Sequence, residues 1–201
     1  MIVKIIPASG TDFHGVQYND KKVEKGTGEL MLMKNFPSFI NGDSSPEQVR
    51  DYFKSISKNE KVKKPQFHAV ISAKYQNHSK EELTEIAKDF MQEMGYGKQP
   101  FIVVYHSDTE NNHVHIVSTR VDKQTGKKIN DSYERLKAQK ALADLLEKRY
   151  GISSEEKLEK LLNYQIGSIS QLELLLERSG FKLTKDTNNE NDFSILKNGV
   201  K

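Results

Sequence analysis

The sequence of 201 residues contains no cysteine and no tryptophan. Without cysteine the chain cannot form disulfide bonds, thiolate zinc sites, iron–sulfur clusters or a cysteine nucleophile. It also lacks a long apolar run: residues 101–105 (Phe-Ile-Val-Val-Tyr) are typical of the longest, whereas a membrane-spanning helix needs about 20 apolar residues. We therefore expect a cytoplasmic protein that does not insert into a membrane.

Charge is nearly balanced, with 31 basic and 28 acidic residues and a net charge of +3. The basic residues are clustered, however, in residues 54–64 and again at Arg120, Lys123, Lys127 and Lys128. Clustered Lys and Arg side chains neutralise phosphates, although many such clusters are only solvated surface. Charge alone therefore leaves contact with nucleic acid as an open hypothesis.

Hydrophobic periodicity predicts an α+β fold. Residues 8–29 are expected to form a turn-rich loop because they contain four glycines and few apolar positions. The other patterns predict a central, mostly antiparallel sheet with helices on one face, and a small C-terminal extension of two helices and a hairpin. The expected domains are a core over residues 1–150 and an extension over 151–201, and the chain has the character of a piece of a longer protein. Strands are expected at 1–6, 66–72, 101–106, 113–120, 181–184 and 193–196, and helices at 46–58, 79–94, 132–150, 154–163 and 168–179.

Three of the six histidines fall within ten residues: His106, His113 and His115. In a strand, side chains at i and i+2 point to the same face, so His113 and His115 should lie side by side. An antiparallel hairpin over residues 101–120 would bring His106 opposite this pair. Three neutral imidazoles on one sheet face form an open metal site with room for water or a substrate oxygen.

Two acidic residues, Asp108 and Glu110, lie in the connector of this hairpin. Histidine ligands usually donate their second ring N–H to a carboxylate or a carbonyl, so Asp108 is the expected hydrogen-bond partner. A structural zinc site would need a fourth ligand, for which only Glu110 or His68 is available nearby. Otherwise the pattern indicates no special role for His68.

The chemistry of such a site depends on the group that accompanies the metal. Bound water would make a hydrolase, whereas a tyrosine would make an enzyme that becomes covalently joined to a nucleotide. Tyr18 is the best candidate among the eight tyrosines because its neighbours are polar and Lys21 and Lys22 follow it. These two lysines could bind a phosphate or favour the phenolate.

The residues around these histidines resemble the relaxases, the mobilisation nucleases of the tyrosine HUH endonuclease class, in the MobA/VirD2-like group. The resemblance covers about residues 1–150. It is carried by the third motif, His-x-Asp followed by His-x-His, in Tyr105-His106-Ser107-Asp108 and Asn112-His113-Val114-His115-Ile116-Val117. Residues 118–122, 126–129 and 67–72 continue the family's pattern.

The resemblance implies site- and strand-specific nicking and rejoining of single-stranded DNA at an origin of transfer. By its position Tyr18 is the implied nucleophile, and His14, four residues earlier, is the alternative. The implied cofactor is a divalent metal, Mg²⁺ or Mn²⁺, at a site that Zn²⁺ or Ni²⁺ could also occupy. The implied partners of this monomer are origin DNA, accessory mobilisation proteins and a coupling protein. The implied DNA-binding residues are Arg120, Lys123, Lys127 and Lys128.

Two other functions remain open on the sequence alone. A metal-dependent phosphodiesterase that uses bound water would need the same histidines but no tyrosine. A non-catalytic nucleic-acid-binding module would need neither, and the lack of aromatic stripes argues mildly against it.

Overall fold

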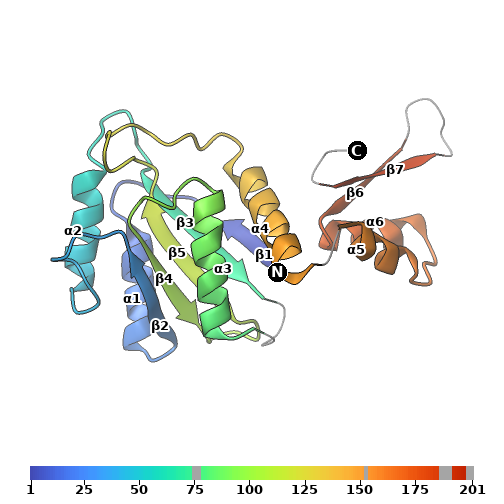
Figure 1. Cartoon of the computed structure of the whole chain (residues 1–201), viewed down its shortest axis with the longest axis horizontal. Helices are drawn as coiled ribbons and strands as arrows, with labels where there is room; N and C mark the ends of the chain where they lie inside the picture. Colours follow the sequence, from blue (N-terminus) through green and yellow to red (C-terminus); the bar gives the residue numbers. More distant parts are fainter. Residues whose placement is uncertain (74–77, 152–153, 186–191, 198–201) are drawn as a thin grey trace. The chain divides into compact units, whose positions relative to one another are not determined.

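A computed structural model describes residues 1–73, 78–151, 154–185 and 192–197 of the chain (Figure 1). The chain divides into two compact units, Met1–Leu142 and Ala143–Lys201. Helix α4, Glu134–Tyr150, begins in the first unit and continues into the second. The other elements of the first unit are β1 (Ile2–Ile5), α1 (His14–Glu24), β2 (Gly28–Lys34), α2 (Pro46–Ile56), β3 (Gln66–Ser72), α3 (Lys80–Glu93), β4 (Phe101–His106) and β5 (His113–Thr119).

The first unit is built on a five-stranded sheet in the order β1-β3-β5-β4-β2, and every neighbouring pair is antiparallel. The predicted α+β class with a mostly antiparallel sheet is confirmed. The predicted hairpin is also confirmed, as β4 and β5 pair directly and His106 lies opposite His113. The β4–β5 hairpin lies between β3 and β2, so its residues are covered on both edges.

Helices cover both faces of the sheet. On one face, Val16 of α1 and Phe53 of α2 belong to a cluster with Val104 of β4 and Val117 of β5. The opposite face of β5 carries Val114 and Ile116, which are fully buried, and α3 contacts β5, β4 and β2 from this side. The expectation of helices on one face only is therefore wrong, because the strands from residue 101 to 120 are apolar on both faces and each face needs a cover.

Helices α2 and α3 begin within one residue of their predicted positions, each after a serine cap, whereas α4, predicted from residue 132, begins at Glu134. The Ser45 side chain accepts a hydrogen bond from the backbone N–H of Gln48, whose side chain accepts one from the backbone N–H of Ser45, and Pro46 occupies the first helical turn. This reciprocal pair forms a capping box at the start of α2. At the start of α3 the Ser79 side chain accepts a single hydrogen bond, from the backbone N–H of Glu82.

The prediction of a loop over residues 8–29 is wrong, because the structure forms α1 there. The helix follows Phe13, which adopts a left-handed conformation (φ 48°) and has no side-chain cap. Phe13 is held in this conformation by burial, since its ring stacks on Phe53 with 5.1 Å between the ring centres. Strand β2 was also not predicted from the sequence, since it lies partly within the expected loop.

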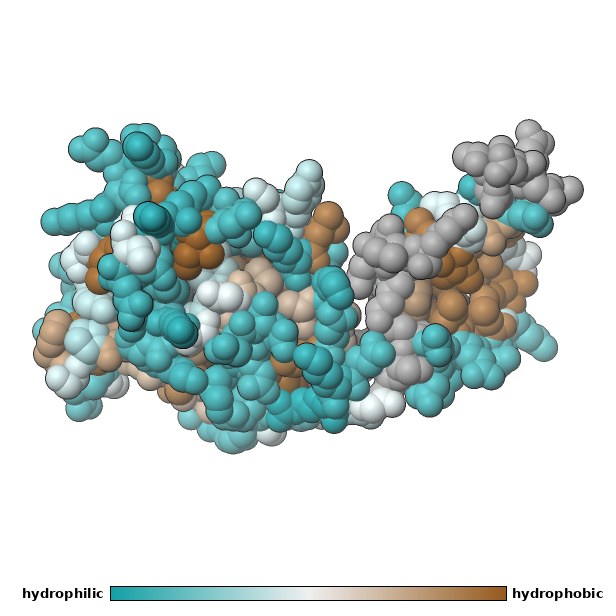
Figure 2. All heavy atoms as spheres, turned by 45° about the horizontal axis from the view of Figure 1, so that its top comes forward, coloured by the Kyte–Doolittle hydropathy of each residue, from teal (hydrophilic) through white to brown (hydrophobic). Residues whose placement is uncertain are grey.

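The second unit contains α5 (Ser154–Leu162), α6 (Ile169–Arg178) and the antiparallel pair β6 (Phe181–Lys185) and β7 (Phe193–Lys197). The predicted two helices and terminal hairpin are confirmed, although the tip of the hairpin lies outside the described residues. Apolar side chains gather on the surface of this unit (Figure 2). The exposed large ones among its described residues are Tyr150, Leu162, Tyr164, Ile169, Leu174 and Phe193. Within the described part of the chain, no helix has the length and apolar character to cross a membrane.

Candidate metal centre and active site

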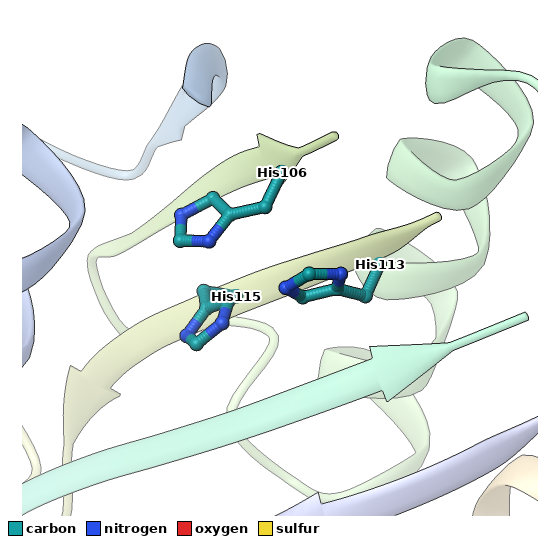
Figure 3. A group of neighbouring side chains, drawn as sticks. All are labelled: His106, His113 and His115. Carbon is teal, nitrogen blue, oxygen red and sulfur yellow. The ribbon is translucent and has the colours of Figure 1, made fainter. Parts of the chain in front are cut away.

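The three histidines predicted as ligands lie together at the ends of β4 and β5, and their rings approach one another (Figure 3). His106 and His113 are direct cross-strand partners, and His115 lies two residues further along the same face of β5. One nitrogen from each ring lies within 4.8 Å of the other two. The alternation of strand side chains and the hairpin register together produce this arrangement.

His106 is the most unusual of the three rings. It is fully buried, and neither of its ring nitrogens has a hydrogen-bond partner among the described residues. Burial, together with the nearby His113, lowers the pKa of His106 to about 4, so the ring is neutral near pH 7. An unpaired buried polar group costs about 1–3 kcal/mol, and a cation bound to a ring nitrogen would remove that cost. The residues therefore fit a divalent metal.

The other two rings have hydrogen-bond partners. Nδ1 of His113 lies 3.0 Å from the backbone oxygen of Asn111 and donates to it, which leaves the lone pair on Nε2. Nδ1 of His115 lies 2.9 Å from Nε2 of His68. Burial, followed by the neighbouring His106, lowers the pKa of His115 to about 2 and that of His68 to about 4. Both rings are thus neutral and one proton is shared between them.

Sequence analysis missed the contact between His68 and His115. In the structure the two residues are diagonal neighbours, because His68 on β3 pairs with Val117, which lies two residues from His115 on β5. Diagonal neighbours on one face of an antiparallel pair are close enough for side-chain contact. The order of the strands, which puts β3 beside β5, was not available from the sequence.

The predicted hydrogen-bond partner, Asp108, lies at the edge of the site. Its Oδ1 is 4.0 Å from Nε2 of His113, and its Oδ2 forms an ion pair with Lys22. The hydrogen bond from Lys22 lowers the pKa of Asp108 and raises that of Lys22. Asp108 is therefore ionised, and it holds the Lys22 ammonium near the histidines.

Among the described residues, Tyr18 is the tyrosine whose ring packs against the histidines. Its ring centre lies 5.4 Å from that of His115 and 5.9 Å from that of His106. The residue is 46% exposed, so a substrate could reach it. His14 lies one turn earlier on α1, and its Nε2 is 4.0 Å from Oδ2 of Asp12.

The four basic residues predicted to bind DNA are in different environments. Arg120 is only 5% exposed, and its guanidinium binds Glu134, with 2.9 Å from Nε to Oε1. It also lies over the ring of Phe67, on the sheet face opposite His68. The charge of Arg120 is therefore paired with Glu134 inside the fold. Lys123 donates to the Asn35 backbone oxygen at 3.0 Å, Lys128 pairs with Asp131 at 2.8 Å, and Lys127 is exposed.

Comparison with protein families matches residues 18–152 to the MobA/VirD2-like relaxase nuclease domain. The chain belongs to this family. The matched segment begins at Tyr18 and contains all three histidines, so it covers the site described above. No curated protein and no solved structure matches the chain. Relaxases of this family use a divalent metal, and in this relaxase domain the three imidazoles are the donors that fit one.

Proposed function

We propose that this relaxase domain nicks one strand of DNA at the origin of transfer of a mobile element and later rejoins it. Tyr18 is the nucleophile, and His106, His113 and His115 hold a divalent cation. The proposal rests above all on one observation, the packing of the exposed Tyr18 ring against His106 and His115.

The reaction is a transesterification. Oη of Tyr18 forms a bond to the scissile phosphorus while the bond from phosphorus to the 3′ oxygen breaks. The products are a 5′-phosphotyrosine and a free 3′-hydroxyl, and the proton lost by the phenol equals the proton gained by the 3′ oxygen. A cation at the three imidazoles supplies stabilisation of the negative charge that develops on the phosphate. The number of phosphodiester-type bonds is unchanged, so the strand can be rejoined by the reverse step.

The sheet surface beside the histidines is accessible to a single strand of DNA. The register places Ser72 and Val70 of β3 on the same face as His113 and His115, and it places Ile2 and Lys4 of β1 next to them. Ile2 is 68% exposed and Lys4 is also exposed, so this part of the sheet is accessible within the first unit. Apolar and cationic groups together suit the bases and phosphates of a single strand.

Three lysines follow Tyr18 on α1 and at its C-terminal end. Lys21, Lys22 and Lys25 come three, four and seven residues after Tyr18, and Lys22 is 5.8 Å from its ring centre. Such lysines release counterions when they contact phosphates. We propose that they carry the contact with the DNA backbone near the nick, together with the exposed Lys127.

The finer properties follow the family resemblance. We propose Mg²⁺ or Mn²⁺ as the working metal, although three imidazoles also suit Zn²⁺ or Ni²⁺. Accessory mobilisation proteins and a coupling protein are the proposed partners of this monomeric, cytoplasmic enzyme.

A covalent-capture experiment tests the proposal and at the same time selects the sequence of the nick site. A randomised single-stranded DNA library is incubated with the protein and Mn²⁺, and the adducts that survive denaturing electrophoresis are sequenced. A labelled oligonucleotide of the selected sequence is then tested with the wild type, Tyr18→Phe and His14→Ala, each with and without EDTA.

We expect adduct from the wild type and His14→Ala, and none from Tyr18→Phe or after EDTA. Tyr18→Phe should still bind the oligonucleotide. Adduct from Tyr18→Phe would exclude Tyr18 as the nucleophile, and multiple-turnover cleavage without adduct would identify a phosphodiesterase that uses water.

A further inference from the structure

Strand β3 begins with two buried polar side chains, Gln66 and His68, each about 5% exposed. They are two residues apart, so they lie on the same face, the one that carries Val117 and the metal centre. Buried polar groups are costly unless they are hydrogen-bonded. His68 has a hydrogen bond to a metal-ligand candidate, and Gln66 has one to the helix that carries Tyr18.

His68 contacts the metal centre. Its Nε2 lies 2.9 Å from Nδ1 of His115, and both groups are buried. If His115 is to offer Nε2 to a cation, its Nδ1 must carry the ring proton and donate it to Nε2 of His68. The proton of His68 then resides on its own Nδ1. This bond therefore fixes both the tautomer and the ring orientation of His115.

Gln66 contacts the nucleophile's helix instead. Its Oε1 accepts a buried hydrogen bond of 2.8 Å from the backbone N–H of Gly15, in the first turn of α1. No side chain caps α1 at Phe13, so Gln66 satisfies one of the helix's free N–H groups from the neighbouring strand. Tyr18 lies three residues later, within one turn of this anchor.

Gly15 allows the close approach that makes this anchor possible. A Cβ at Gly15 would lie 3.0 Å from Oε1 of Gln66, 3.1 Å from Nδ1 of His68 and 3.1 Å from Cγ2 of Val117. Helix α1 thus meets the sheet at the same two side chains that face the site.

We propose that Gln66 and His68 are positioning residues with separate targets: His68 orients His115 toward the cation, and Gln66 sets the position of Tyr18 over the histidines by anchoring α1. This inference rests on the proposed function and deepens it. It assigns to one strand the relative placement of the nucleophile and the metal ligands.

The test is a comparison of two variants on two readouts that need no DNA. The first readout is the affinity for Co²⁺, followed by its visible absorption. The second is the ¹⁹F NMR shift that bound Co²⁺ induces at Tyr18 in 3-fluorotyrosine-labelled protein, with the resonance assigned by Tyr18→Phe. A cation shifts a resonance according to its distance and direction, so this second readout reports the position of the phenol.

We expect His68→Ala to weaken Co²⁺ binding by about 10–100-fold, and His68→Gln, whose amide oxygen can accept from His115, to recover part of that loss. We expect Gln66→Met to leave Co²⁺ affinity within about twofold but to change the Co²⁺-induced shift at Tyr18. His78→Gln removes an imidazole outside the site, and Gln99→Met removes a buried, hydrogen-bonded glutamine elsewhere in the fold. Neither control should change the Co²⁺ affinity or the Co²⁺-induced shift at Tyr18.

Equal Co²⁺ affinity in His68→Ala and the wild type would overturn the assignment of His68. An unchanged Tyr18 shift in Gln66→Met, or the same change in Gln99→Met, would overturn that of Gln66. Failure of the proposed function is distinguishable, since it is the absence of covalent adduct from a wild-type protein that binds Co²⁺ and shows the Tyr18 shift.

Discussion

Lys22 of α1 and Asp108 of the β4–β5 connector form an ion pair at the mouth of the metal centre, one helical turn after Tyr18. The two residues are 86 positions apart in the sequence. The pair joins the helix that carries the phenol to the loop between the histidine strands. It also holds a positive charge close to the ring of Tyr18.

Replacement of Lys22 should weaken DNA binding through the loss of one phosphate contact. In Lys22→Ala, the slope of log affinity against log salt for a single strand should fall by about 0.7. Fluorescence anisotropy with a labelled single strand at several salt concentrations measures this slope. Lys88→Ala is the matched control, because Lys88 also forms an ion pair but lies on α3, on the other face of the sheet. Equal slopes in the wild type and Lys22→Ala would exclude the contact.

Substitution of His106 should separate metal binding from folding. In His106→Leu the two unpaired buried nitrogens are removed, so the metal-free protein should be as stable as the wild type or more stable, by about 1–3 kcal/mol. The stabilisation that saturating metal gives the wild type, about 2.7 kcal/mol at 100 times Kd, should be lost. Thermal unfolding with EDTA and with Mn²⁺ tests both effects. A variant that Mn²⁺ still stabilises to the wild-type extent would show that His106 is not a ligand.

Gly15→Ala should destabilise the fold because the new methyl group would lie closer to Gln66, His68 and Val117 than ordinary van der Waals contact allows. Overpacking of this kind costs about 1–3 kcal/mol. Gly42→Ala is the control, since a Cβ there meets nothing within 4 Å. Urea unfolding of the two variants should show the difference. Equal midpoints would mean that α1 can move away from the sheet at little cost.

The metal-free protein should lose stability as the pH falls from about 6.5. Burial lowers the pKa of His68 and His106 to about 4, whereas an unfolded histidine titrates near 6.5. Between these values the unfolded chain binds more protons than the folded one, so the contribution is present above pH 6.5 and is lost as the pH falls toward 4. Urea unfolding in EDTA at pH 7, 6, 5 and 4.5 measures this slope. In His106→Leu it should decrease by about one proton; an unchanged slope would contradict the assignment.

Arg120 should matter for folding and not for metal binding. Its partner Glu134 and its own side chain are both largely buried, so Arg120→Met would leave an unpaired buried charge. Removal of one partner of such a pair costs about 3–5 kcal/mol. Equilibrium unfolding tests the loss, and Lys127→Met serves as the exposed basic control. A stability loss below about 1 kcal/mol, the most that an exposed ion pair usually contributes, would indicate that Arg120 is not a structural residue.

The part of the site that the sequence predicted is the part that depends on local geometry. His113 and His115 share a face because strand side chains alternate, and a short connector returns His106 to them. The same rule, applied one step further, places Arg120 on the opposite face, because it is an odd number of residues from His115. That consequence was available from the sequence and was overlooked.

The part that could not be predicted depends on contacts between distant segments. Helix α1 has few apolar residues, and it is held by burial of Val16, by packing of the preceding Phe13 on Phe53 and by the Gly15–Gln66 bond. His68 gains its role from the order of strands in the sheet, which puts β3 beside β5. Neither relationship leaves a periodic pattern within one window of sequence.

The partial exposure of Tyr18 has a consequence for cargo. In the proposed reaction, a strand joined to Tyr18 would leave from an exposed side chain of the first unit, so no described segment of that unit would have to open for it to pass, whatever its length. The same protein could therefore remain joined to a short oligonucleotide or to an entire replicon without a change in its own folding.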